Sequence, residues 1–125
     1  MRKILITGSR DIFPEKQIRK DLESLTNYGT MHLVVIHGGA SGVDETADQV
    51  AKSMGIHTVR VDALWNTFHK AAGPIRNRMM LALEPDECLA YSNDFEESKG
   101  TQNMIEQCRK AGIPVTLRET NEITL

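Results

Sequence analysis

The chain has 125 residues, with 15 lysines and arginines against 17 aspartates and glutamates, which gives a formal net charge of −2. This length fits one compact domain with a buried core, so we expect a single domain over residues 1–125. The charge balance excludes a bulk attraction to nucleic acid or to an anionic membrane, and any anion has to be held by local groups. The apolar run before Gly8 is too short for a signal peptide or a membrane span, which indicates a soluble, cytoplasmic protein.

Five short segments rich in apolar and β-branched residues are typical of strands, and they lie at 3–7, 32–37, 57–61, 87–91 and 114–117. Apolar residues recur at helical spacing between them, and one helix is predicted at 74–83, with Pro74 in its first turn. Strands this apolar, alternating with helices, predict an α/β fold: a Rossmann-like, three-layer domain with a mostly parallel five-stranded sheet. Residues 118–125 are interpreted as a C-terminal tail.

The loops that follow the strands differ from those that follow the helices. Helix-to-strand connections are short and plain, whereas strand-to-helix connections are rich in polar residues and glycine, namely "GSRDIFP", "GGASG", "DALWNTFHKAAG" and "SNDFEESKGT". In a doubly wound sheet every strand-to-helix loop emerges at the carboxyl edge of the sheet, where ligands bind. The sequence therefore predicts a binding site at that edge.

The stretch "HGGASGVD" follows the second predicted strand and opens a helix. Gly38, Gly39 and Gly42 permit positive φ angles and close approach of the backbone, and the amides at the helix start suit a phosphate or carboxylate. The stretch matches neither a Walker loop nor GxGxxG. The alternative is a tight turn in which Ser41 or Asp44 only caps the helix.

Three further loops carry similar features at the same predicted edge. Arg10 ends "TGSR", Arg76 lies in the first turn of the helix after "AAGP", and "SKGT" offers Gly100 for close approach with Thr101 as a cap. Each loop alone also fits an ordinary turn with a solvated arginine or a simple cap. Together they concentrate positive charge at one edge, through Arg10, Lys70, Arg76, Arg78 and Lys99.

Aromatic and histidine side chains near this edge have two interpretations each. Trp65 and Phe68 lie in the long third loop and either stack on a base or, as the preferred interpretation, anchor that loop in the core. His37 and His69 lie near the predicted site, where each is a candidate ligand or catalytic group or a structural histidine.

The two cysteines, Cys88 and Cys108, lack the paired spacing of a zinc site and lie in apolar segments, so we expect buried structural thiols. No set of His, Cys or carboxylate residues has metal-ligand spacing. We predict no structural metal and no cofactor.

The ordered set "ITGSR", "VIHGGASGVDETA", "AAGPIRNRMM", "SKGT" and "AGIPV" resembles the YspA/cpYpsA-related family of the SLOG superfamily. The resemblance implies a Rossmann-like fold that binds nucleotides or nucleotide-derived small molecules, and a homodimer or higher homo-oligomer. Carried over by position, with Lys99 added for its charge, the predicted ligand-binding residues are Gly8, Ser9, Arg10, Gly38, Gly39, Ser41, Gly42, Asp44, Arg76, Asn77, Lys99, Gly100 and Thr101.

Relatives in that superfamily include the LOG phosphoribohydrolases, which cleave the N-glycosidic bond of nucleoside monophosphates and carry a PGGxGTxxE signature with a catalytic Glu. The aligned stretch here is "ESKGTQNM", with Met104 in place of that Glu. A thioether accepts no proton, so chemistry would need another carboxylate, for which Asp44 and Glu97 are predicted and Glu45 and Glu96 are alternatives.

Three functions follow in order of preference. The first is binding of a nucleotide-derived small molecule for sensing or sequestration. The second is hydrolysis or transfer at an N-glycosidic bond of a nucleoside phosphate. The third is single-stranded DNA binding, as in the related DNA-processing protein A, although this chain lacks the long basic stripe of such proteins.

Overall fold

The computed structural model describes residues 1–120 of the chain. The elements in chain order are β1 (Arg2–Gly8), α1 (Glu15–Leu25), β2 (Leu33–His37), α2 (Val43–Ser53), β3 (His57–Arg60), α3 (Trp65–Phe68), the 3₁₀ turn η1 (His69–Ala71), α4 (Ala72–Leu81), β4 (Glu87–Ser92), α5 (Lys99–Lys110) and β5 (Val115–Glu119).

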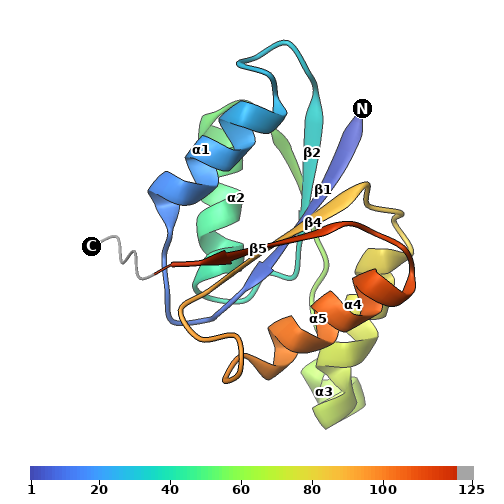
Figure 1. Ribbon diagram of the computed structural model, residues 1–125. Coiled ribbons are helices and arrows are strands. Elements are labelled where there is room, and N and C mark those ends of the chain that lie inside the picture. The colour runs from blue at the N-terminus through green and yellow to red at the C-terminus, as the bar shows by residue number, and fades with distance from the viewer. Residues whose placement is uncertain (121–125) are drawn as a thin grey trace.

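The five strands form one sheet in the order β3-β2-β1-β4-β5, and every neighbouring pair is parallel. Helices α1 and α2 lie on one face of this sheet and α4 and α5 on the other (Figure 1). The predicted Rossmann-like α/β fold is confirmed. After β3 the chain crosses to the other side of β1, so the strand order reverses between β1 and β4.

The core lies in two layers because successive side chains of a strand point to opposite faces. On β1, Ile4 and Ile6 join the apolar cluster beneath α1 and α2, and Leu5 between them joins the cluster beneath α4 and α5. All three are fully buried. Cys88 and Cys108 belong to the second cluster, as expected of structural thiols.

Polar contacts join β4 and β5 to α1. Tyr91 of β4 donates a hydrogen bond from its Oη to Oδ2 of Asp21 in α1, over 2.6 Å, and Arg118 of β5 donates to both oxygens of the same carboxylate. Burial and the bond to Asp21 raise the pKa of the Tyr91 hydroxyl, which therefore stays a donor. The predicted tail at 118–125 is thus wrong for Arg118 and Glu119, which belong to β5; residues 121–125 lie outside the described residues.

The third predicted loop also differs from expectation. It contains the short helix α3, which buries no residue, and α4 begins at Ala72, two residues before the predicted helix. Trp65 and Phe68 are 47% and 41% exposed, so the prediction that they anchor the loop in the core is wrong. The physical reason is that α3 stands off the lower end of the sheet (Figure 1). Across residues 1–120, no helix is long and apolar enough to cross a membrane.

Candidate functional site

A cavity of about 440 Å³ lies at the carboxyl ends of β1 and β4, where the strand order reverses, and we name it the switch-point cavity. This is the position at which doubly wound sheets bind ligands. The predicted site residues that line it are Gly8, Ser9, Arg10, Asp44, Arg76, Asn77, Glu97, Lys99, Gly100 and Thr101.

A second cavity of about 360 Å³ adjoins the first, and we name it the arginine cavity. The two cavities share Arg10, Ala40 and Arg76 in their walls. The remaining residues of the arginine cavity are Gly38, Gly39, Ser41, Arg60, Asp62, Ala63 and Trp65. Of the predicted ligand-binding residues, Gly42 lines neither cavity, and of the predicted cations, Lys70 and Arg78 line neither.

Three serine hydroxyls close the floor of the switch-point cavity. Ser9, at the end of β1, lies 2.7 Å from both Ser92 Oγ and Ser98 Oγ, and these two lie 3.1 Å apart. The triangle ties the end of β1 to the end of β4 and to the residue before α5. Ser9 and Ser98 face the cavity, whereas Ser92 is fully buried.

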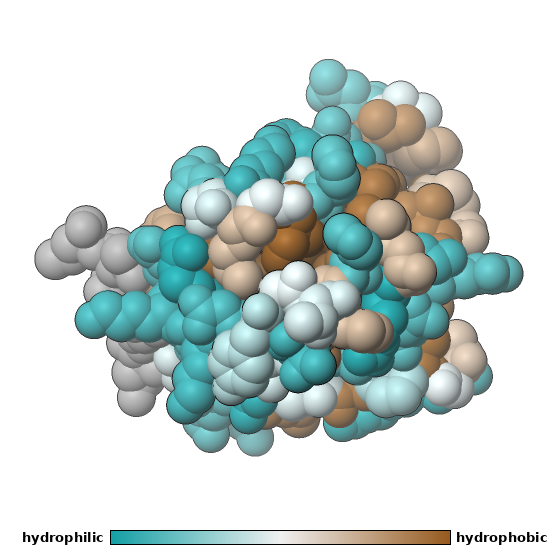
Figure 2. All heavy atoms as spheres, turned by 90° about the horizontal axis from the view of Figure 1, so that it is seen from above, coloured by the Kyte–Doolittle hydropathy of each residue, from teal (hydrophilic) through white to brown (hydrophobic). Residues whose placement is uncertain are grey.

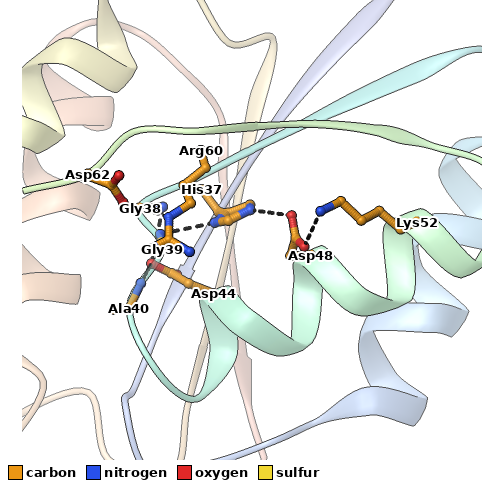
Figure 3. A network of polar contacts seen from close by, with 9 residues as sticks. All are labelled: His37, Gly38, Gly39, Ala40, Asp44, Asp48, Lys52, Arg60 and Asp62. Atoms are coloured by element: carbon orange, nitrogen blue, oxygen red, sulfur yellow. Dashed lines mark hydrogen bonds and ion pairs between the residues drawn. The ribbon is translucent and has the colours of Figure 1, made fainter.

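The amides of the glycine loop bind the protein itself. The N–H groups of Gly38 and Ala40 donate to Oδ2 of Asp44 over 3.2 and 3.3 Å, and that of Gly39 donates to Nδ1 of His37 over 3.0 Å (Figure 3). Neither Ser41 nor Asp44 caps α2, which begins after Gly42 without a side-chain cap among the described residues. Asp44 instead holds the loop in its conformation, and the amides of Gly38, Gly39 and Ala40 are occupied by internal partners.

The glycines of this loop make room for other parts of the protein. A Cβ at Gly38 would overlap the guanidinium of Arg76, and a Cβ at Gly39 would overlap that of Arg60. Gly42 has φ of 78°, and a Cβ there would meet the backbone of Arg10. The loop is therefore a seat for two arginine side chains, packed against the end of β1.

His37 anchors the loop from behind. Its Nδ1 accepts from Gly39, so its Nε2 carries the proton and donates to Oδ1 of Asp48 over 2.8 Å; Lys52 holds the other oxygen of Asp48 (Figure 3). Partial burial disfavours the charge of Asp48, but hydrogen bonds from Lys52 and His37 outweigh this and lower its pKa to about 2. His37 is 1% exposed and lines neither cavity, while His69 is exposed and away from both.

Two cations at the junction of the cavities have no carboxylate partner within ion-pair distance among the described residues. Arg76 donates from Nη1 to the carbonyl of Gly38 over 2.6 Å and from Nε to Asn77, which leaves Nη2 for a ligand. Burial lowers the pKa of Arg76; Asp44 opposes this effect and the like charge of Arg10 adds to it. Arg10 lies over the ring of Trp65, with its Cζ 5.8 Å from the ring centroid.

The first turn of α5 forms the opposite wall of the switch-point cavity. Lys99, Gly100 and Thr101 line the cavity, and no side chain in residues 1–120 caps this helix start. The predicted cap at Thr101 is wrong, because α5 begins at Lys99 and Thr101 is a buried residue inside its first turn. The residue at the cap position is Ser98. Asn77 fixes the turn by donating to the carbonyl of Gly100 and to Asn103. Amides at an uncapped helix start favour an anion.

The two carboxylates predicted for catalysis lie in different environments. Asp44 is 7% exposed, and burial raises the pKa of its carboxyl, although the Ala40 amide and the charge of Arg76 oppose the shift. Its Oδ2 holds the glycine loop, which leaves Oδ1 for a ligand. Glu97 is exposed and stands at the rim of the switch-point cavity.

Sequence reasoning missed Arg60, Asp62, Ser92 and Ser98. Arg60 is the last residue of β3, Asp62 follows the strand, and the two side chains pair over 2.6 Å. The available signal was a charged pair at the end of a strand that leads into one of the polar loops. The two serines gave no local signal for the site, since their contacts with Ser9 join residues more than eighty positions apart. No group of three or more His, Cys, Asp or Glu in residues 1–120 is arranged to hold a metal ion.

A family model described as "YspA, cpYpsA-related SLOG family" matches residues 2–68, more than half of the chain. The chain belongs to this SLOG family. It is similar to the "Gene 61 protein" of Mycobacterium phage D29, with 37% identity over 120 residues that cover 92% of this chain and 94% of the phage protein.

The SLOG fold of this chain is also similar to that of DNA processing protein A (DprA) from Streptococcus pneumoniae, with a TM-score of 0.75 and 21% sequence identity. The match covers 94% of this chain and 50% of the DprA chain, so this SLOG chain spans about half the length of DprA. At this identity the likeness concerns the fold.

Proposed function

We propose that this SLOG protein binds a nucleotide-derived small molecule, with a phosphate held at the first turn of α5 and the sugar turned toward Asp44. The observation that carries the proposal is the convergence of Arg10, Arg76 and an uncapped helix start on one cavity. In a chain of net charge −2, cations without carboxylate partners are expected to neutralise an anion.

Three details support a phosphate at this position. Nη2 of Arg76 and the first-turn amides of α5 are donors that suit phosphate oxygens. A Cβ at Gly100 would meet no atom within 4 Å, so a ligand can approach the backbone there. The glycine loop contributes by seating Arg76, since its own amides at Gly38, Gly39 and Ala40 already have acceptors.

Calorimetric titration of the four common nucleoside 5′-monophosphates and their parent nucleosides tests this proposal. We expect at least one monophosphate to bind, and its nucleoside to bind at least about 100-fold more weakly, because it loses several charge-assisted hydrogen bonds to phosphate, each worth roughly 1.5–3 kcal/mol. A Gly100→Val variant, whose side chain would enter the cavity, should lose the phosphate preference. Equal affinity for nucleotide and nucleoside would contradict a phosphate grip.

Hydrolysis of an N-glycosidic bond is a second candidate, favoured by the buried carboxyl of Asp44 with its raised pKa beside the same cavity. Met104, at the position of the LOG catalytic Glu, is fully buried in the apolar cluster beneath α4 and α5, so it offers no carboxylate. Chromatography of each bound monophosphate after long incubation tests for released base. Release that persists in Asp44→Asn would contradict a role for Asp44.

Single-stranded DNA binding stays a third prediction, to be tested with oligonucleotides of increasing length. Affinity that grows with length and falls steeply with salt would favour it over a small-molecule ligand. Competition between an oligonucleotide and a bound monophosphate would show whether both use the switch-point cavity.

A further inference from the structure

The arginine cavity raises a question that a monophosphate ligand does not answer. Arg10, Arg60 and Arg76 all line it, against the single carboxylate of Asp62, which Arg60 already binds. Its charge is therefore positive before any ligand arrives. A single phosphate, held by α5 and by Arg76 in the neighbouring cavity, would place no negative group inside the arginine cavity itself.

The strongest repulsion between like charges lies at the junction of the two cavities. Arg10 and Arg76 both line each cavity, and burial and the charge of Arg10 lower the pKa of Arg76, while the charges of Asp44 and Asp62 oppose this. Two neighbouring guanidiniums repel each other unless an anion lies between them. We therefore expect one negative group of the ligand at the junction and another at the first turn of α5.

Trp65 adds a flat apolar surface beyond the junction. Its ring lines the arginine cavity, is 47% exposed, and carries the Arg10 guanidinium at 5.8 Å from its centroid. An exposed tryptophan beside cations is a surface on which a sugar or a base can stack. The order along the two cavities is then a helix start, a pair of arginines and an aromatic ring.

Building on the proposed nucleotide binding, we infer that the ligand is a nucleoside diphosphate whose distal phosphate carries a further sugar or nucleoside. One phosphate lies at the first turn of α5, the other lies between Arg10 and Arg76, and the terminal group enters the arginine cavity beside Trp65 and Arg60. The glycine pair Gly38 and Gly39 has a direct part in this design, because it leaves room for the guanidiniums of Arg76 and Arg60.

The test compares, for each of the four common bases, a nucleoside monophosphate with a nucleoside diphosphate sugar; ADP-ribose serves for adenine. Calorimetry on the full chain is expected to show a diphosphate sugar binding at least about tenfold more tightly than its monophosphate. Equal or tighter binding of every monophosphate would overturn the inference and leave the proposed function standing. No binding of either class would overturn both.

Two variants test whether the tighter binding of the diphosphate sugar comes from the arginine cavity. Trp65→Ala and Arg60→Met each alter an exposed side chain, so both proteins should fold, as checked by circular dichroism. Each should weaken the diphosphate sugar about tenfold and the monophosphate much less, because neither side chain lines the switch-point cavity. Phe68→Ala, on the same short helix as Trp65 but outside both cavities, is the matched control. An unchanged preference in both variants would overturn the inference.

Discussion

The two ends of the sheet carry cavities of similar size but different chemistry. At the amino ends of the strands, a cavity of about 480 Å³ is lined mainly by apolar and weakly polar residues, among them Tyr28, Met31 and Leu33, and by no lysine or arginine. Figure 2 looks onto this end of the molecule, where apolar and near-neutral residues gather near the centre among hydrophilic ones. The switch-point cavity is slightly smaller, at about 440 Å³, yet it gathers cations, a buried carboxylate and a helix start. Convergent polar groups, rather than volume, mark the candidate site.

The parallel topology produces this difference. All five strands point the same way, so each strand-to-helix loop and each helix start lies at the carboxyl edge, and each helix end lies at the other. Gly29, Gly55 and Gly112 follow helix ends with positive φ and open space around them, as expected of residues that only end a helix. Gly38, Gly39 and Gly42 at the carboxyl edge are instead crowded by arginines and by backbone.

The largest expected effect is that of Arg76→Met. It removes the half-buried cation that both cavities share, so affinity for a phosphorylated nucleotide should fall about 30- to 100-fold, with the nucleoside affected far less. Arg78→Met, two positions along the same helix and outside both cavities, is the control and should bind normally. Equal loss of nucleotide and nucleoside binding would show that Arg76 acts only through the fold.

A pair of glycine substitutions separates binding from stability. Gly38→Ala should displace the flexible Arg76 guanidinium, with about tenfold weaker nucleotide binding and little change in melting temperature. Gly42→Ala should instead unfold the protein more easily, by about 2 kcal/mol or more, since its φ is positive and its Cβ would meet backbone. Calorimetry and thermal denaturation of both variants measure the contrast, and similar outcomes for the two would refute it.

Asp44→Asn should make the protein more stable and a weaker binder at neutral pH. Because burial raises the pKa of Asp44 in the folded state, this group favours folding below its ordinary value of 3.8 and loses that contribution as pH rises through the folded pKa. The amide keeps an acceptor for Gly38 and Ala40, so a gain of about 3 °C is expected at pH 7, vanishing below about pH 4. Asp62→Asn, which removes one charge of an exposed ion pair, is the control and should show no such gain in melting temperature.

A smaller effect, on the free energy of unfolding, is expected from substitution of Asp48, which lies behind the glycine loop. Its pKa of about 2 lies below the ordinary 3.8, so its charge favours folding above pH 4 and that contribution is lost as pH falls toward 2. Asp48→Asn should therefore lower the free energy of unfolding by less than about 1 kcal/mol at pH 7, with the difference from the parent protein closing near pH 2. Urea denaturation over that pH range measures it; a constant difference would argue against the ion pairs.

The smallest expected effect is at the amino edge. Tyr28→Ser removes a side chain that is 83% exposed and lines the cavity there. Nucleotide affinity should remain within about twofold of the parent protein, since no lysine, arginine or helix start among residues 1–120 lines that cavity. A loss comparable to that of Arg76→Met would reverse the assignment of the two edges.

Periodicity and loop composition were enough to predict the fold and the edge of the sheet that carries the polar groups. Both follow from local rules: apolar strands alternating with striped helices form parallel sheets, and such sheets collect their strand-to-helix loops at one edge. For the same reason Arg10, Arg76 and Asp44 could be placed near one another from the sequence.

The sequence did not predict which partner each backbone amide or side chain contacts. Glycine spacing indicates close approach of the backbone, but it does not say whether a ligand or an arginine approaches. The amides of Gly38 and Gly39 have acceptors in Asp44 and His37, a consequence of how α2 packs behind the loop. The exposure of Trp65 likewise depends on where α3 lies, which no local pattern encodes.

The serine triangle gives the floor of the switch-point cavity an adjustable polarity. Each hydroxyl both donates and accepts, and in each of its three contacts either oxygen can be the donor. Rotating the hydroxyl hydrogens around the ring reverses the direction of the bonds without moving a heavy atom. While all three contacts are made, each hydroxyl hydrogen is used inside the ring, so Ser98 offers a ligand an acceptor; it offers a donor to a phosphate oxygen only when it gives up its bond within the ring.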